Sequence, residues 1–214
     1  MRKEQRAENR NQRTKKRKEQ GLVYVFTGEG KGKTSAAIGV GVRAALNGMK
    51  VGMVCWYKSK DWDVSEYRLP KKLSNFRVFP MGVGFRITNH ESRIMGKRGK
   101  VIKIASLTGG GKVVDSVSES KHREAAGEAL EKARALLGKV DVLILDEVNN
   151  AVSDGLIDLS ALIDLISKRG TTHCILTGRG AHQKIIEKAD LVTEMRKIKH
   201  PFDLGKKAVK GLDF

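Results

Sequence analysis

Residues 22–35 read LVYVFTGEGKGKTS, and this stretch determines the class of fold. Its first five residues form an unbroken apolar run rich in β-branched and aromatic side chains, which predicts a strand buried on both faces. A glycine-rich loop follows, and AAIGVGVRAAL after the loop predicts a helix that ends at residues 47–48. A second apolar run at residues 51–56 predicts another buried strand. Strand, loop, helix and strand in this order form a βαβ unit, which indicates a parallel sheet.

The glycine-rich segment is typical of a loop that holds phosphate groups. It follows the pattern G-x-x-x-x-G-K-[ST], with threonine in place of the first glycine, and it connects a predicted strand to a predicted helix as the mechanism requires. Glycines allow backbone N–H groups to turn inward, and the helix start adds its dipole and unpaired amides. Lys33 supplies a positive charge, and the hydroxyl of Thr34 is a ligand for Mg²⁺. The predicted nucleoside triphosphate site comprises Thr27, Gly28, Glu29, Gly30, Lys31, Gly32, Lys33, Thr34 and Ser35.

A pair of carboxylates supports this prediction. Residues 142–147 read VLILDE, an apolar strand that ends in Asp146 and Glu147. This arrangement brings an acid near Mg²⁺ beside a phosphate loop. The sequence leaves open which of the two carboxylates contacts the ion, and the two motifs together predict the substrate but not the reaction.

The rest of the chain continues the alternation of strands and helices. Apolar runs predict strands at residues 141–146, 172–177 and 191–195, and helical spacing predicts helices at residues 120–137, 159–167 and 181–189. The pattern weakens from residue 76 to 118, where we expect a short strand at RVFPM and a hairpin that turns at residues 109–111. Together these elements predict an α/β fold, a doubly wound, mainly parallel sheet in the three-layer, RecA-like architecture of the P-loop NTPases.

The length of 214 residues predicts one domain with short appendages. Residues 1–20 hold nine basic and three acidic residues, so we expect a basic N-terminal extension that is helical or disordered. The P-loop α/β domain is expected at residues 21–199, and residues 200–214 form a tail with mixed signals.

The composition limits which classes of partner are expected. The formal net charge of +18 attracts polyanions, but aromatic residues make up only 5% of the chain, so nucleic acid is not expected as a partner. No stretch approaches the ~20 apolar residues of a membrane-spanning helix. Cys55 and Cys174 lie in apolar runs, which favours buried thiols and a cytoplasmic location.

Four segments occur in order along the chain: VFTGEGKGKTSAAIGVGVRA, DVLILDEVNNAV, ILTGRGAH and KHPFDLGKKAVKGLDF. In them the chain resembles the P-loop ATP:corrinoid adenosyltransferases, which act on cob(I)yrinic acid a,c-diamide or cob(I)alamin. The similarity covers most of residues 21–85 and 119–214. It implies that the 5′-adenosyl group of ATP is transferred to the Co(I) of a corrinoid. Triphosphate is released, in the biosynthesis or salvage of adenosylcobalamin, the vitamin B12 coenzyme.

The same resemblance implies ligands and partners. ATP is the co-substrate, with Mg²⁺ or Mn²⁺, and it is bound in reverse relative to other P-loop enzymes, so that its 5′-carbon is exposed. The resemblance also implies a flavoprotein reductase as the electron donor and a homodimer, in which an N-terminal helix can cover the neighbouring active site. Since Co(I) is itself a strong nucleophile, the protein's tasks are to align the 5′-carbon and to stabilise the departing triphosphate.

Carried over residue by residue, the resemblance assigns phosphate binding to residues 28–35, with Lys33 as a catalytic residue. It also places Arg43 near the nucleotide, and the alternative for this residue is a surface cation on an amphipathic helix. Lys58 and Trp62 align loosely with a family lysine and tryptophan after the second strand, as structural residues or at the rim of the site. Further candidates are Arg179 and His182. The last two follow the carboxyl end of a strand, where ligands of α/β proteins gather, although a capping role explains them equally well.

One departure from the family pattern concerns the corrin. The family commonly has G-F-T-W, whose aromatic pair crowds the lower face of the corrin, excludes the axial ligand and eases reduction of Co(II). Residues 84–87 read GFRI, so Phe85 is retained as a catalytic candidate and Ile87 stands in place of the tryptophan. Residues from about 86 to 118 look like an insertion relative to the family.

Two other functions stay open from the sequence. A nucleic-acid-dependent ATPase with a RecA-like core would use the same phosphate loop, and the net charge favours it. A regulator that binds corrinoid or nucleotide without catalysis would account for the missing tryptophan. The reaction products distinguish both from a transferase.

Overall fold

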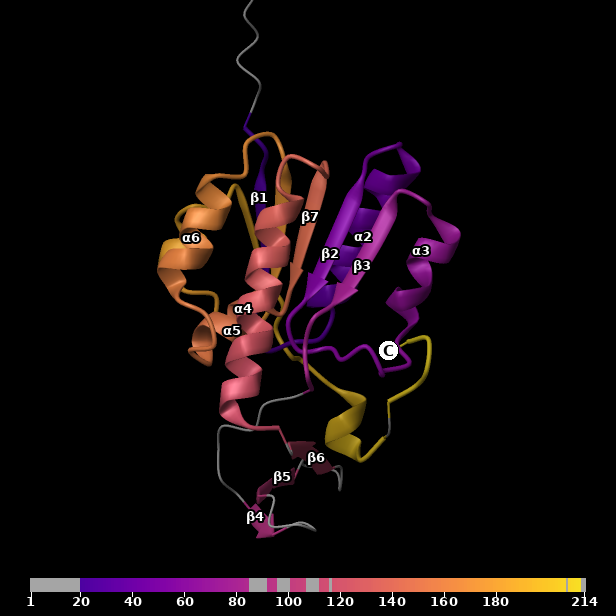
Figure 1. The fold of residues 1–214 in the computed structure, drawn as a ribbon. Coiled ribbons are helices and arrows are strands. Elements are labelled where there is room, and N and C mark those ends of the chain that lie inside the picture. Colours follow the sequence, from indigo (N-terminus) through magenta and orange to yellow (C-terminus); the bar gives the residue numbers. More distant parts are fainter. Residues whose placement is uncertain are drawn as a thin grey trace, which may run out of the picture.

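The computed structural model describes residues 20–84, 92–95, 101–106, 112–115, 117–206 and 208–212. A six-stranded sheet lies at its centre (Figure 1). In their order across the sheet, the strands are β3 (Phe76–Pro80), β2 (Val51–Cys55), β7 (Val142–Asp146), β8 (His173–Thr177), β1 (Val23–Thr27) and β9 (Leu191–Glu194). Every neighbouring pair is parallel, which confirms the predicted doubly wound α/β fold and is consistent with a P-loop NTPase.

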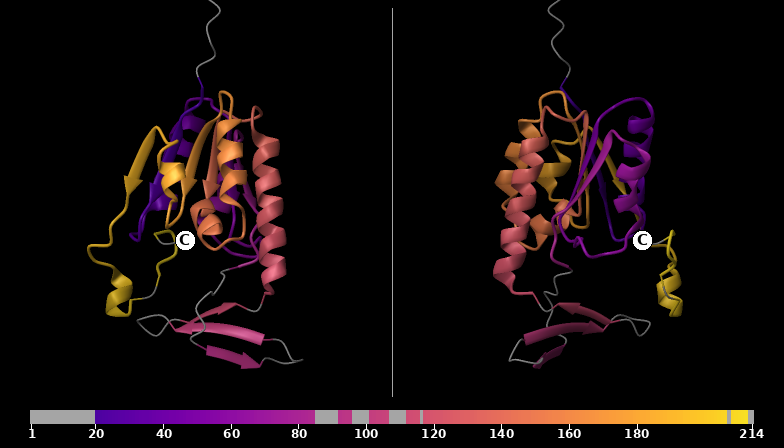
Figure 2. Two further views of the ribbon diagram at one scale, coloured as in Figure 1. Left: turned by 90° about the vertical axis from the view of Figure 1, so that its left-hand side faces the viewer. Right: turned by 45° about the vertical axis from the view of Figure 1, so that its right-hand side comes forward.

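Helices cover both faces of the sheet. One face carries α4 (Glu119–Leu136), α5 (Val148–Ser153) and α6 (Leu159–Ser167), and the other carries α2 (Lys33–Leu46) and α3 (Leu69–Lys72) (Figure 1, Figure 2). Shorter helical turns are α7 (Gln183–Ile186) and the 3₁₀ helices Ser65–Arg68 and Pro201–Leu204. The result is the expected arrangement of three layers.

Two apolar cores lie between these layers. In β7, Leu143 packs toward α4 and α6, whereas Ile144 packs toward α2, and both side chains are fully buried. Burial on both faces is what the unbroken apolar runs predict. The helix α2 approaches the sheet closely at Gly41, where a Cβ would lie 2.9 Å from Ile144 Cδ1 and 2.9 Å from Phe76 Cε2. A larger residue at this position would displace the helix or these two side chains.

The helix predicted at residues 181–189 is wrong in its extent, because α7 covers only Gln183–Ile186. Hydrogen bonds donated by backbone N–H groups on both sides of α7 explain the difference. Ala181 N donates to Thr27 Oγ1 at 3.3 Å, and Asp190 N donates to Val23 O at 2.8 Å. These bonds tie both flanks to β1, so only a short helical turn fits between them.

A second sheet is antiparallel and has three strands, β4 (Ser92–Met95), β5 (Val101–Ser106) and β6 (Lys112–Asp115). It lies beyond the amino end of α4 (Figure 1). β5 and β6 confirm the predicted hairpin, whereas its turn at residues 109–111 lies outside the described residues, as do residues 1–19 of the predicted N-terminal extension. The sequence did not predict β4, and the assignment of this region as an insertion stays a prediction.

Within the described part of the chain, none of the helices combines the length and apolarity that crossing a bilayer requires. Cys55 and Cys174 are buried free thiols, as the sequence predicts. Burial raises the pKa of the Cys174 thiol to about 12, so this side chain is protonated and acts as part of the core.

Candidate active site

The loop between β1 and α2 curves around the amine of Lys33. Gly28 and Gly32 adopt left-handed backbone angles, with φ of 95° and 112°. Inside the curve, Lys33 Nζ donates to the carbonyl oxygen of Gly28 at 2.7 Å and to that of Gly30 at 2.8 Å. Burial lowers the pKa of Lys33 from its ordinary value, and the negative charge of Glu147 opposes this shift without cancelling it. A buried amine bonded to neutral carbonyl groups therefore lies where the sequence predicts phosphate.

The segment after β9 supports this loop. Gly30 N donates to Met195 O at 2.6 Å, and Met195 N donates to Thr27 O at 2.8 Å. A Cβ at Gly28 would lie 2.5 Å from the same Met195 oxygen, and a Cβ at Gly30 would lie 2.7 Å from it. Both positions require glycine because the backbone of Met195 approaches so closely.

Asp146, at the end of β7, is fully buried and accepts hydrogen bonds from several side chains. Its Oδ1 accepts from Thr34 Oγ1 at 2.8 Å and from Thr177 Oγ1 at 2.9 Å. Its Oδ2 accepts from Lys58 Nζ at 2.8 Å. Thr34 and Asp146 thus place two oxygen donors of the kind that Mg²⁺ prefers side by side next to the phosphate loop. The residues present fit a magnesium ion.

Glu147 has different surroundings. It directly precedes α5 and has a left-handed φ of 62°, and its backbone N donates to Thr177 Oγ1 at 2.8 Å. Burial, followed by the negative charge of Asp146, raises the pKa of Glu147. Of the two carboxylates that the sequence left open, Asp146 is the one bonded to Thr34.

Lys58 connects Asp146 to another acid. It follows β2, and its Nζ also donates to Glu66 Oε1 at 2.5 Å, in the 3₁₀ helix Ser65–Arg68. Burial acts to lower the pKa of Lys58, but the carboxylates of Asp146 and Glu66 outweigh it and hold this pKa above its ordinary value. The ammonium group of Lys58 is therefore charged and balanced by two carboxylates.

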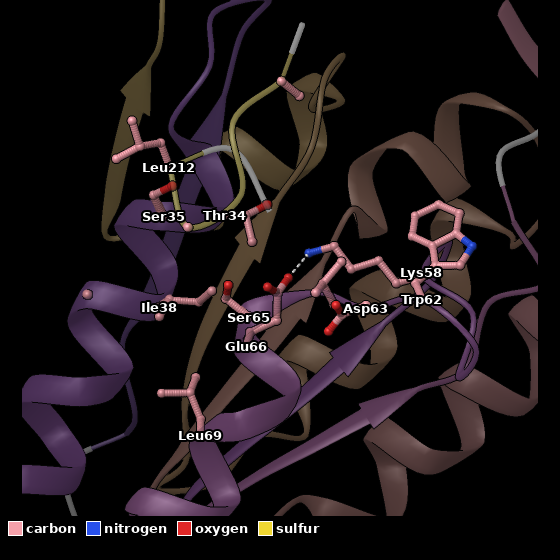
Figure 3. A pocket seen from close by; sticks show the side chains of 14 residues that line it. Thr34, Ser35, Ile38, Lys58, Trp62, Asp63, Ser65, Glu66, Leu69 and Leu212 are labelled. Atoms are coloured by element: carbon pink, nitrogen blue, oxygen red, sulfur yellow. Dashed lines mark hydrogen bonds and ion pairs between the residues drawn. The ribbon is translucent and has the colours of Figure 1, made fainter.

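A cavity of about 1000 Å³ adjoins these residues (Figure 3). Its walls come from the first turns of α2, from the segment after β2 and from the C-terminal tail. The side chains that line it include Thr34, Ser35, Ile38, Lys58, Leu69 and Leu212. An ion pair between Lys210 and Asp63 holds the tail against the segment after β2. The tail, which the sequence left without an assigned structure, thus forms part of the site.

Comparisons with known proteins agree with this geometry. The model of the family "ATP:corrinoid adenosyltransferase BtuR/CobO/CobP" matches residues 19–214. The chain belongs to this family. The corrinoid adenosyltransferase of Pseudomonas aeruginosa is 33% identical over 201 residues, which cover 92% of this chain and 86% of that protein. The corrinoid adenosyltransferase of Escherichia coli K12 is 31% identical over 199 residues, 92% of this chain and 87% of that protein. The corrinoid adenosyltransferase of a Sinorhizobium species is 43% identical over 93 residues, 42% of this chain and 44% of that protein.

Most of the residues predicted for this adenosyltransferase site come together at the carboxyl ends of the strands. The loop from Thr27 to Ser35 adjoins Asp146 through the hydrogen bond of Thr34, and the charge of Glu147 acts on Lys33 in the same loop. Arg43 does not join them. It lies in the last turn of α2 and lines a separate pocket of about 310 Å³ at the amino ends of the strands. Phe85, predicted to face the corrin, lies outside the described residues.

The other candidates fall into different places. His182 caps α7, because its Nδ1 accepts from Lys184 N at 3.1 Å, which favours the capping interpretation. Trp62 lines the cavity together with Lys58 (Figure 3). Arg179 lies beside the phosphate loop, where its Nε is 3.2 Å from Glu29 Oε2.

Sequence reasoning missed two residues that organise the site. The hydroxyl of Thr177 bonds both to Asp146 and to the backbone of Glu147. The sequence could have indicated Thr177, because this residue belongs to the family segment ILTGRGAH. Glu66 carried no such signal, since nothing in its own segment indicates that it meets Lys58 and, through it, Asp146.

Proposed function

We propose that the chain carries out the reaction of its family, transfer of an adenosyl group from ATP to a corrinoid, with Co(I) as the nucleophile. The cobalt donates an electron pair to the 5′-carbon. The bond between that carbon and the α-phosphate oxygen breaks, and its electron pair leaves with triphosphate. The observation that carries this proposal is the buried amine of Lys33 inside the loop. Its hydrogen-bond partners are the neutral carbonyl groups of Gly28 and Gly30, so these bonds leave its positive charge unbalanced. Such a charge stabilises a departing polyanion.

The position of the cavity supports the reversed orientation of ATP. The cavity begins at Thr34 and Ser35, at the end of the phosphate loop, and has a volume of about 1000 Å³. A triphosphate held by the loop can therefore direct its sugar into this space, where the second reactant would meet it. Holding the two reactants in line lowers the barrier without any base from the protein.

Thr34 and Asp146 are the residues that would hold Mg²⁺, or Mn²⁺ in its place. When bound, the ion neutralises negative charge that develops on the triphosphate. Lys58 bonds the other oxygen of Asp146 and so orients this carboxylate with Oδ1 toward Thr34. Glu147 remains the alternative ligand, but its carboxyl is buried and the raised pKa disfavours its ionised form.

The products of the reaction test the proposal. The protein is incubated with ATP, Mg²⁺ and a chemically reduced corrinoid, and triphosphate and a light-sensitive cobalt–carbon bond are measured. We expect both products in equal amounts. Orthophosphate whose release is stimulated by DNA or RNA would instead indicate the ATPase, and binding of both substrates without turnover from Co(I) would indicate the regulator.

Phe85→Ala tests the predicted role of Phe85 at the corrin. If this side chain excludes the axial ligand, the variant loses activity mainly when the reaction starts from Co(II), because only then is the reduction needed. We expect a loss of about tenfold or more from Co(II), in line with about 1.4 kcal/mol for each factor of ten. An equal loss with chemically reduced Co(I) contradicts the role.

Several features implied by the resemblance stay predictions. They are the homodimer and the flavoprotein reductase. The cytoplasmic location that the two cysteines favour also stays a prediction. Sedimentation of the purified protein tests the first of these, and reduction of the bound corrinoid by a candidate flavoprotein tests the second.

A further inference from the structure

A turn after β8 brings an arginine to the rim of the phosphate loop. Residues 177–181 read TGRGA. Arg179 Nε lies 3.2 Å from Glu29 Oε2, so the turn and the loop are joined by an ion pair. Both side chains are largely exposed, 59% for Arg179 and 74% for Glu29, and the guanidinium is therefore accessible to a ligand in the loop.

The backbone of this turn is held in place on two sides. Arg179 N donates to Asn150 Oδ1 at 2.7 Å, in α5, and Gly178 N donates to Phe26 O at 3.2 Å, in β1. Gly178 has a φ of 127°, and a Cβ there would lie 2.5 Å from Asn150 Oδ1. The turn thus requires glycine and presents Arg179 from a rigid base, which reduces the entropy lost when the side chain binds a ligand.

The charge of Arg179 acts on the groups inside the site. Burial has the largest effect on the pKa of Lys33 and on that of Glu147, but the positive charge of Arg179 lowers both. Arg179 therefore lies within electrostatic reach of the place where phosphate is expected. Its present partner, Glu29, belongs to the phosphate loop itself and repels any anion that enters.

The ion pair between Glu29 and Arg179 is a weak one. Exposed pairs of this kind contribute about 0–1 kcal/mol, because water screens them. A guanidinium gains more from phosphate, since its planar fork donates two parallel hydrogen bonds to phosphate oxygens. Exchange of one partner for the other is therefore favourable when triphosphate is present.

We propose that Arg179 is a further triphosphate-binding residue, which Glu29 holds at the rim of the loop and releases to the triphosphate when ATP binds. After the transfer, Glu29 competes for the guanidinium again and so aids release of the triphosphate product. The inference rests on the proposed function, because it requires triphosphate in the loop. It adds a cation from a second segment of the chain to the charge of Lys33.

Binding of inorganic tripolyphosphate, measured by titration calorimetry, tests this proposal without any need for turnover. Arg179→Ala should weaken binding by about tenfold, the lower end for one charge-assisted hydrogen bond. Arg179→Lys should restore only part of this, since lysine lacks the fork. Glu29→Gln should tighten binding severalfold, because it removes the competitor, and Arg179→Ala in the same chain should remove that gain.

Arg123→Ala is the matched control. Arg123 pairs with Glu119 at 3.1 Å on α4, and both side chains are about half exposed. This variant should bind tripolyphosphate like the unchanged protein. If Arg179→Ala weakens binding no more than Arg123→Ala does, Arg179 does not contact the triphosphate. If Glu29→Gln weakens binding instead of tightening it, the competition between Glu29 and phosphate is overturned.

Lys33→Ala separates this inference from the proposed function. If Lys33→Ala loses tripolyphosphate binding and Arg179→Ala binds it as well as the unchanged protein does, the role of Arg179 is overturned and the proposed function stands. Unchanged binding in Lys33→Ala would contradict the phosphate loop itself. Circular dichroism and the thermal midpoint of each variant establish that the fold is retained before binding is compared.

Discussion

Two lysines lie at the same edge of the sheet in opposite surroundings. The amine of Lys33 bonds to the carbonyl groups of Gly28 and Gly30, whereas that of Lys58 bonds to the carboxylates of Asp146 and Glu66. Burial lowers the pKa of Lys33, but in Lys58 the two carboxylates outweigh burial and raise the pKa. The two lysines therefore have different roles, since Lys33 is suited to bind an anion and Lys58 stabilises the protein. The charge of Lys33 is available to an anion, and the charge of Lys58 is already balanced within the protein.

The largest expected effect comes from Lys33→Ala. Without this charge the loop loses its main electrostatic contact with the leaving triphosphate, so we expect turnover to fall by about 1000-fold or more. The measurement is triphosphate release with ATP, Mg²⁺ and a reduced corrinoid. Stability should change little by comparison, because Lys33 balances no carboxylate through a hydrogen bond in the described site. A variant that turns over at the normal rate would contradict the role of Lys33.

Lys58→Met should differ from Lys33→Ala by having a large effect on stability. It leaves the carboxylates of Asp146 and Glu66 buried near each other without their cation, at a cost of about 3–5 kcal/mol in the free energy of unfolding. Urea unfolding measures this cost. The second change Glu66→Gln in the same chain should recover part of it, because one of the two charges is removed.

Lys168→Met is the control for this prediction. Lys168 pairs with Asp164 at 2.9 Å, but its side chain is 68% exposed, so its removal should cost less than about 1 kcal/mol. Equal losses in the free energy of unfolding in Lys58→Met and Lys168→Met would contradict the conclusion that Lys58 balances buried carboxylates.

The smallest expected effect concerns the tail. Lys210 donates a hydrogen bond to Asp63, and this bond is the first cause of the lowered pKa of Asp63. A lowered pKa means that the pair is formed above the ordinary value of 3.8 and is lost as the pH falls through the lower value in the folded protein. We expect Lys210→Ala to increase proteolysis and amide exchange of residues 200–212 severalfold at neutral pH while the sheet is unaffected.

Acid should have the same effect on the tail without any mutation. At a pH below the lowered pKa of Asp63, the unchanged protein should resemble Lys210→Ala, and the two should then exchange at equal rates. Lys206→Ala is the control for the loss of one lysine from the tail. Equal protection of the tail in Lys210→Ala and in the unchanged protein at neutral pH would show that the ion pair does not hold it.

The sequence predicted elements well where the signal is local. The helix at residues 159–167 has the predicted bounds, and the strands of the sheet begin and end within two residues of their predicted positions. Unbroken apolar runs and helical spacing are properties of neighbouring residues, so no long-range information is needed. The phosphate loop belongs to the same class, because its conformation depends on its own glycines and on the strand and helix beside it.

Elements that depend on docking were missed. The helix α5 has only six residues. Burial of Val148 and Ala151 holds it in place, together with Asn150, whose side chain accepts from Arg179 N in another loop. The position of Arg43, in contrast, follows from local geometry. Arg43 lies ten residues after Lys33 in one helix, and ten helical residues span about 15 Å. This length places Arg43 at the far end of α2 from the phosphate loop.

By itself, the sequence determined the parallel α/β fold, the phosphate loop and the resemblance that led to the corrinoid adenosyltransferases. Each of these is encoded by contiguous residues, whose spacing survives any change elsewhere in the chain. Only the tertiary structure decided which acid meets Thr34, which cation is balanced and which is available, and what closes the cavity. Those features arise where the ends of several strands and the C-terminal tail converge, and the distances between such segments are set by packing rather than by position along the chain.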